Sequence, residues 1–189
     1  MQTRLTLVCC GLAPSARRGV FAAGDALDER ALAGTAALKP LLAGARRALT
    51  APDLGARQTA DALGLAARQE PALRGQDFGR WAGKGLDEIG RAEPEALAAW
   101  LADPDAVPGG GESFSAVAAR TAAWLETLRA ESGHTVAVTH PAVVRAAILA
   151  VIGAAPACFA RIDVVPLSLT DLRGDGRRWM LRATGLTAR

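Results

Sequence analysis

The sequence predicts a three-layer α/β/α domain with a largely parallel central sheet. Two short apolar runs, at 5–11 and 135–139, are rich in Leu, Val and Thr and stop abruptly, which is typical of buried strands. Alanine- and leucine-rich segments of helical character lie between the predicted strands, and strands that alternate with helices favour a parallel sheet. The length of 189 residues suits one domain, 1–189, with a substantial core.

The N-terminal strand is expected to stop at a sharp turn, because Gly11 and Pro14 follow its apolar residues. Residues 12–26 show no clear period and predict a long loop over the end of that strand. A helix is predicted over about 30–38, and Pro40 should end or kink it because proline cannot continue a helix.

The second strand is predicted at 46–50. It is followed by a helix that runs to residue 64, for which Asp53 is the expected N-cap. Residues 67–90 are rich in glycine and are predicted to be irregular. A further helix is expected at 94–102, where proline occupies the first turn.

The glycine-rich loop 109–113 is predicted to be flexible, and its last residue can cap a long helix that reaches about residue 132. After the strand at 135–139, a helix is predicted over 141–152. The end of the chain, 161–182, predicts two strands joined by a Gly-Asp-Gly hairpin turn at 174–176.

Composition excludes several classes of function. The net charge is only +3, the arginines are scattered and tyrosine is absent, so we expect no nucleic-acid partner. No apolar run approaches the roughly 18 residues of a membrane span and no signal peptide is evident, so we expect a cytoplasmic protein with no membrane contact. Three cysteines and two histidines predict neither a disulfide framework nor a metal site, and no cofactor is expected. Of the histidines, His134 is expected to be exposed.

Five segments, in this order, resemble the histidine phosphatase superfamily, the phosphoglycerate mutase-like proteins. They are L-x-L-V-C-C-G, A-P-x-x-G-A-R-Q-T-A, D-F-G-R-W-A-G, P-G-G-G-E-S and V-T-H-P. Each segment alone is weak, but five in the right order are specific. The resemblance implies a phosphoglycerate mutase-like fold and chemistry on phosphate esters.

The chain departs from the family at the first motif. The resemblance implies that the first strand should end in Arg-His-Gly, with the histidine becoming phosphorylated. Here Cys9 stands at the arginine position and Cys10 at the histidine position, and only Gly11 matches.

The other motifs depart as well. The phosphate-binding arginine of the second motif falls on Gly55, and the family's acid falls on Gly75. Only the second histidine remains, as His140. Each charge-assisted donor to phosphate is worth roughly 1.5–3 kcal/mol, and a positioned general acid about 10²–10⁴-fold in rate. These losses argue against the family's ordinary catalysis.

Several residues could replace what is missing. Arg17 and Arg18 follow the first strand and could reach back to a phosphate. Cys10 could act as a nucleophile, although the cysteine-phosphatase motif C-x₅-R is absent, or it could fill the space of the lost histidine as a small apolar residue. Asp77 could serve as the acid or lie on the surface, and Glu112 could contact a ligand or cap a helix.

Three hypotheses remain open. The first is a catalytically silent relative that binds phosphate or a small phosphorylated molecule. Its expected ligand-binding residues are Cys9, Gly11, Arg17, Asp77, Glu112 and His140. The second is an altered phosphomonoesterase in which His140 works with Cys10 or Asp77. The third is a non-catalytic protein-interaction module, for which a homodimer is one form.

Overall fold

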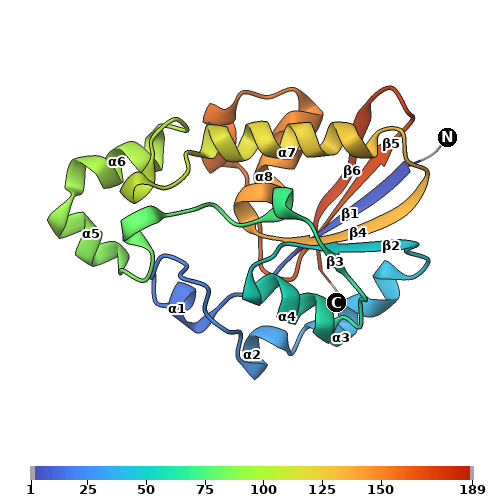
Figure 1. Cartoon of the computed structure of the whole chain (residues 1–189), viewed down its shortest axis with the longest axis horizontal. Coiled ribbons are helices and arrows are strands. Elements are labelled where there is room, and N and C mark those ends of the chain that lie inside the picture. Colours follow the sequence, from blue (N-terminus) through green and yellow to red (C-terminus); the bar gives the residue numbers. More distant parts are fainter. Residues whose placement is uncertain (1–2, 188–189) are drawn as a thin grey trace.

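A six-stranded sheet in the order β3-β2-β4-β1-β5-β6 lies at the centre of the computed structural model, which describes residues 3–187 (Figure 1). The strands are β1 Thr3–Cys9, β2 Arg47–Thr50, β3 Arg68–Gln69, β4 Gly133–Thr139, β5 Leu169–Gly174 and β6 Trp179–Leu186. The four strands from β3 to β1 are parallel, and β5 and β6 add an antiparallel edge. The predicted α/β class with a largely parallel sheet is confirmed.

Helices cover both faces of this sheet. They are α1 Pro14–Arg17, α2 Glu29–Leu32, α3 Thr35–Leu38, α4 Leu54–Ala62, α5 Leu86–Ala92, α6 Pro94–Ala102, α7 Phe114–Leu128 and α8 Pro141–Ile152. In Figure 1, α7 and α8 lie above the sheet and α3 and α4 lie below it, which gives the three predicted layers. Among the described residues, no helix combines the length and the apolar character that a membrane crossing needs.

The two central strands are apolar because both of their faces are covered. In β1 every residue except Arg4 is buried, and in β4 every residue from His134 to Thr139 is buried. The two strands pair in parallel, with Cys9 opposite Thr139. Consequently the residues that follow the two strands emerge side by side at one edge of the sheet.

Several element boundaries differ from the sequence prediction. The helix expected at 30–38 is broken into α2 and α3 at Gly34, since glycine is a poor helix former. The predicted irregular segment 67–90 contains β3 and α5. The last two strands begin at Leu169 and Trp179 rather than near 161, because Pro166 has no N–H to contribute to a ladder.

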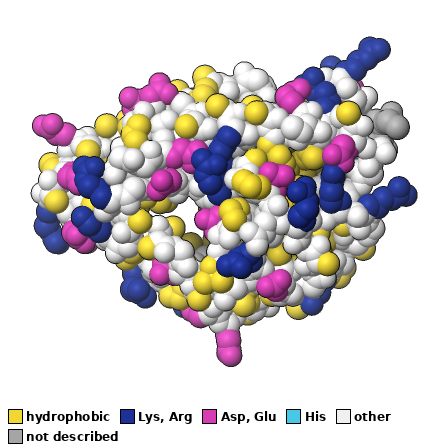
Figure 2. All heavy atoms as spheres, viewed as in Figure 1, with side chains coloured by type: hydrophobic (Ala, Val, Ile, Leu, Met, Phe, Trp, Pro, Cys, Tyr) yellow, Lys and Arg dark blue, Asp and Glu magenta, His cyan; other side chains and the backbone are white. Residues whose placement is uncertain are grey.

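The segments predicted as irregular fold around a second, smaller core. Phe21, Trp81 and Ile89 are buried together, and Phe78 and Trp100 pack against them. The rings of Phe21 and Trp81 lie 5.3 Å apart between centroids, a favourable spacing for an aromatic pair. This core carries α5 and α6 as a lobe beside the sheet, and Figure 2 shows the molecular surface hollowed between the lobe and the rest of the molecule.

The glycine-rich segment predicted as a flexible loop packs tightly against the segment at 77–81. Pro108–Gly110 forms a 3₁₀ turn, and the Glu112 N–H donates to the Asp77 carbonyl at 2.8 Å. A Cβ on Gly111 would overlap the Asp77 carbonyl and lie 2.6 Å from the Gly79 nitrogen. Glycine is needed here because two backbones approach each other closely.

We therefore expect Gly111→Ala to destabilise the protein by about 1–3 kcal/mol through backbone overlap. The matched control is Gly85→Ala, where an added Cβ meets nothing within 4 Å and φ is −76°. Urea unfolding of both variants measures the effect. Equal midpoints for the two variants would contradict the close approach.

Candidate functional site

Three chemically reactive side chains meet at the carboxyl edge of the sheet. Cys10 follows β1, His140 follows β4, and Asp53 lies three residues after the end of β2. These strands are neighbours in the order β2-β4-β1 and run in parallel. The carboxyl edge of a parallel sheet is where open α/β folds bind their ligands.

The three side chains form a row through the imidazole ring. The Cys10 Sγ lies 3.5 Å from His140 Nδ1, and His140 Nε2 lies 3.1 Å from Asp53 Oδ2. The Nε2 atom is shielded from solvent and makes no hydrogen bond of good angle, so its contact with Asp53 is an ion pair. The imidazole thus separates a thiol from a carboxylate.

Backbone contacts fix the two ends of this row. The Cys10 N–H donates to the Thr139 carbonyl at 2.8 Å, which continues the β1–β4 ladder by one residue. The Asp53 carboxylate accepts the Gly75 N–H at 3.1 Å. Asp53 is the N-cap residue of α4, as predicted, but its side chain makes no capping hydrogen bond to that helix.

The electrostatics favour a charged imidazole. Burial alone would lower the pKa of His140, but the charge and hydrogen bond of Cys10 and the Asp53 carboxylate outweigh burial and raise this pKa to about 10. Partial burial would raise the pKa of Asp53, yet the contact with His140 and the hydrogen bond from the Gly75 amide hold it below its usual value. At neutral pH the site therefore contains an imidazolium beside a carboxylate.

Cys9, the other cysteine of the pair, points into the core. It has no exposed surface. Burial and the charge of Cys10 raise the pKa of the Cys9 thiol well above its ordinary value, although Arg145 opposes them. The Cys9 thiol thus stays protonated and has no open path to a ligand.

Gly11 is a tightly packed turn residue. Its N–H donates to Thr59 Oγ1 at 3.0 Å, and an added Cβ would lie 2.8 Å from the Ala31 carbonyl oxygen. A side chain at position 11 would therefore push α2 away from the end of β1.

Two of the other sequence-predicted ligand residues are engaged elsewhere. Arg17 donates to the Leu12 carbonyl at 2.9 Å and forms an ion pair with Asp28. The Asp77 carboxylate accepts the Gly79 N–H at 2.8 Å and so holds its own turn. The structure brings neither side chain into contact with His140.

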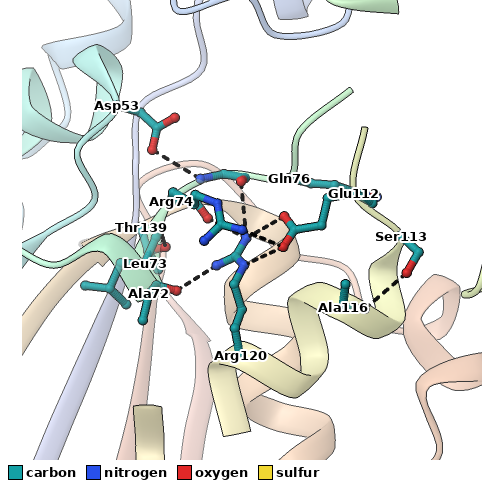
Figure 3. A network of polar contacts seen from close by, with 11 residues as sticks. Asp53, Ala72, Leu73, Arg74, Gln76, Glu112, Ser113, Ala116, Arg120 and Thr139 are labelled. Atoms are coloured by element: carbon teal, nitrogen blue, oxygen red, sulfur yellow. Dashed lines mark hydrogen bonds and ion pairs between the residues drawn. The ribbon is translucent and has the colours of Figure 1, made fainter. Parts of the chain in front are cut away.

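Glu112 belongs to a polar network with two arginines (Figure 3). Its carboxylate accepts from Arg74 at 2.9 Å and from Arg120 at 2.8 Å and 3.0 Å. Glu112 does not cap α7, because Ser113 does so by accepting the Ala116 N–H at 3.2 Å. The helix-capping role left open for Glu112 is therefore wrong, and its contact with a ligand stays a prediction.

Arg120 joins this network to the row of reactive residues. Its guanidinium donates to the carbonyls of Ala72 at 2.6 Å and Arg74 at 2.8 Å, and so holds the segment that carries Gly75 (Figure 3). Thr139, at the end of β4, donates to the Leu73 carbonyl at 2.7 Å. These bonds position the Gly75 N–H for Asp53.

Gly55 and Gly75, which stand where the family resemblance implies an arginine and an acid, have different surroundings. A Cβ on Gly75 would lie 3.4 Å from the His140 ring, so any side chain there would point at the imidazole. A Cβ on Gly55 would lie 3.5 Å from Leu27. Within residues 3–187, no arginine forms a hydrogen bond or ion pair with Cys10 or His140.

His134 is buried, which contradicts the expectation that it is exposed. Its Nε2 lies 2.9 Å from Thr6 Oγ1, and only 8% of the residue is accessible. Burial and the charge of Arg4 lower the pKa of His134. It lies at the opposite end of β4 from His140 and takes no part in the site.

The arrangement does not suit a metal ion. Within the described part of the chain, no group of three His, Cys, Asp or Glu side chains is placed to hold one. Cys10 and Asp53 face opposite nitrogens of the same ring, so they cannot share an ion.

A family model described as histidine phosphatase superfamily (branch 1) matches residues 19–187, most of the chain. The chain belongs to the histidine phosphatase superfamily. The matched region begins at residue 19, so β1 and the two cysteines at its end lie outside the match. No curated protein matches this sequence.

Solved structures of phosphatases and of a hydrolase share this fold. "Mycobacterial hydrolase 1" superimposes with a TM-score of 0.88 at 23% identity, covering 100% of both chains. A mycobacterial glucosyl-3-phosphoglycerate phosphatase in complex with VO3 gives 0.87 at 25% identity, covering 97% of this chain and 99% of that one. The alpha-ribazole phosphatase from Shigella flexneri gives 0.86 at 21% identity, covering 97% and 96%.

The charge state of His140 can be tested by NMR titration of the two histidine rings. We expect the His140 signals to stay in the protonated position through neutral pH and to titrate near pH 10, whereas buried His134 titrates below its ordinary value. In Cys10→Ala the His140 midpoint should move down, because the largest influence that raises it is gone. An unchanged midpoint in that variant would contradict the thiol–imidazole coupling.

Proposed function

We propose that this superfamily member has lost the phosphohistidine reaction and is an altered hydrolase with Cys10 as its nucleophile. The observation that carries the proposal is the 3.5 Å contact between the Cys10 sulfur and His140 Nδ1, at the strand end where the family resemblance implies the phosphorylated histidine. A thiolate beside an imidazolium is a strong nucleophile at neutral pH.

Asp53 supports the same proposal from the other side of the ring. In nucleophile–histidine pairs a third group orients the imidazole and stabilises its charged form. The Asp53 carboxylate lies 3.1 Å from His140 Nε2, opposite Cys10, and occupies that position. Asp53 is therefore the positioning residue, and His140 is the acid–base group.

The family's own reaction fits these residues poorly. A transferred phosphoryl group needs an acceptor imidazole and several cationic donors, and the chain has a thiol in place of the acceptor. Arg74 and Arg120 are both paired with Glu112. For attack on a phosphate monoester, Cys10 is a better placed partner of His140 than Asp77 is. The Asp77 carboxylate already accepts the Gly79 N–H of its own turn.

A second candidate is a silent protein that binds phosphate or a small phosphorylated molecule at His140. It is supported by α8, a helix of 12 residues that begins directly after His140 and has no side-chain cap. The free N–H groups of such a helix end attract anions. Calorimetry with inorganic phosphate and with vanadate on Cys10→Ala tests this candidate separately from any thiol chemistry.

The nucleophile is tested by iodoacetamide alkylation at pH 7 in a Cys158→Ala background, which removes the half-buried third cysteine. We expect Cys10 to be alkylated at least about tenfold faster than in the same protein carrying His140→Ala, since the imidazolium stabilises the thiolate. Asp53→Asn should slow alkylation less than His140→Ala does. Peptide mass spectrometry assigns the modified cysteine, and a rate independent of His140 would contradict the proposal.

Hydrolysis of p-nitrophenyl phosphate from about pH 5 to 8 tests the family reaction. We expect wild type and His140→Ala to differ by less than about tenfold, because one acid–base group in a working site supplies 10²–10⁴-fold. Cys10→His, which restores the family residue, and Cys10→Ala are assayed in parallel. If wild type hydrolyses p-nitrophenyl phosphate about 100-fold faster than His140→Ala, and Cys10→Ala keeps the wild-type rate, the nucleophile is a group other than Cys10. That result would overturn the proposed loss of phosphohistidine chemistry.

A further inference from the structure

Arg120 holds the backbone beside His140 with one guanidinium group (Figure 3). It lies on α7, and only 14% of its side chain is exposed. It donates to the carbonyls of Ala72 at 2.6 Å, Arg74 at 2.8 Å and Gly75 at 3.2 Å. Hydrogen bonds from a charged donor are about twice as strong as neutral ones, so this segment is firmly attached to α7.

The peptide group that joins Arg74 to Gly75 is hydrogen-bonded at both of its ends. Its carbonyl accepts from Arg120 at 2.8 Å, and its N–H donates to Asp53 Oδ2 at 3.1 Å. A donor at the carbonyl polarises the peptide and strengthens the bond that the N–H makes. The guanidinium of Arg120 is therefore coupled to the carboxylate of Asp53 through a single peptide group.

The same carboxylate oxygen of Asp53 contacts His140. Oδ2 accepts the Gly75 N–H at 3.1 Å and lies 3.1 Å from His140 Nε2. The Asp53 side chain is 36% exposed and makes no hydrogen bond to the helix that it precedes. If the Gly75 N–H shifted, this carboxylate could turn toward solvent and leave the imidazole.

We propose that Arg120 is a positioning residue that keeps Asp53 against His140 and so strengthens the hold of the ring on its proton. The contacts from Arg120 through the Arg74–Gly75 peptide and Asp53 to His140 are called the Arg120 relay. The proposal deepens the proposed function and rests on it in one respect, because the protonated ring is the partner of the Cys10 nucleophile. The relay itself reaches the ring at Nε2, whereas Cys10 lies at Nδ1.

The charge of Arg120 acting through space has the opposite effect to the relay. A nearby positive charge disfavours a protonated imidazole, so removing that charge alone would raise the pKa of His140. Loss of the relay would release the Asp53 carboxylate and lower the pKa of His140. The direction of the change therefore distinguishes the two effects.

The other groups around the ring are kept constant or removed in the test. Cys10 and Asp53 are the titratable side chains that contact the ring. Farther out, Arg74 and Glu112 are paired in the network, and Arg145 of α8 donates to the Ile162 carbonyl. A Cys10→Ala background removes the thiol, so the titration of His140 then reports the Asp53 side of the ring.

The closing experiment is an NMR titration of His140 in the Cys10→Ala background. We expect Asp53→Asn to lower the His140 midpoint by about 1–3 pH units, the range for loss of an adjacent opposite charge. Arg120→Gln should lower it by about one pH unit, because Asp53 keeps its charge but loses its position. The ring of His134, at the opposite end of β4, is the internal reference and should not change.

A double-mutant cycle tests whether Arg120 acts through Asp53. In the protein that already carries Asp53→Asn, adding Arg120→Gln should not lower the His140 midpoint further. A further fall of the same size as in the single variant would overturn the relay, because Arg120 would then act by another route.

Two further variants separate the relay from general damage to the fold. Arg120→Gln combined with Glu112→Gln leaves no buried charge unpaired, and it should lower the midpoint as Arg120→Gln does. Glu112→Gln alone keeps the carbonyl bonds of Arg120 and should leave the midpoint near that of the background. The matched control is Arg129→Gln, about 14 Å farther along the axis of α7 in an exposed pair with Glu126, where no change is expected.

The outcomes separate this proposal from the proposed function. An unchanged or raised His140 midpoint in both Arg120 variants would overturn the relay and leave the Cys10 nucleophile untouched. In the protein that retains Cys10, Arg120→Gln should slow alkylation by iodoacetamide no more than Asp53→Asn does. A lowered midpoint together with alkylation that does not depend on His140 would support the relay and overturn Cys10 as the nucleophile.

Discussion

The parallel alignment of β2, β4 and β1 is the constraint on which the candidate site depends. Because these neighbouring strands run in the same direction, the residues after them emerge at one edge of the sheet, and Cys10, His140 and Asp53 meet there from positions far apart in the chain. The register that sets Cys9 opposite Thr139 places the thiol beside the imidazole. A shift of one residue would turn every side chain of the strand to the other face.

The row is also held from outside the sheet. Arg120 and Glu112 are among the less exposed charged residues, at 14% and 10% of side-chain area, and they satisfy each other while Arg120 binds the carbonyls of the Gly75 segment. Removing one partner would leave a largely buried charge without its counter-ion, which is more costly than losing an exposed pair. The polar network in Figure 3 therefore sets the position of the backbone that Asp53 contacts.

The family resemblance implies that several positions around this site carry other side chains than the family's. The backbone superimposes on a glucosyl-3-phosphoglycerate phosphatase with a TM-score of 0.87. The position at which the family resemblance implies a phosphate-accepting histidine holds a thiol, and glycines stand where an arginine and an acid are implied. Since fold and function are set by different residues, the same scaffold can support a different reaction.

The sequence by itself determined the α/β class, the family and the position of His140, because buried strands, helix starts and ordered motifs are local patterns. Capping of α7 by Ser113 was predictable for the same reason. Only the tertiary structure decided that the Asp53 side chain faces His140 instead of bonding to α4, that Arg120 pairs with Glu112, and that His134 is buried. Asp53 and His140, and Arg120 and the carbonyls of Ala72 and Arg74, are tens of positions apart in the chain. Sheet order and loop packing choose these partners, and no local pattern encodes them.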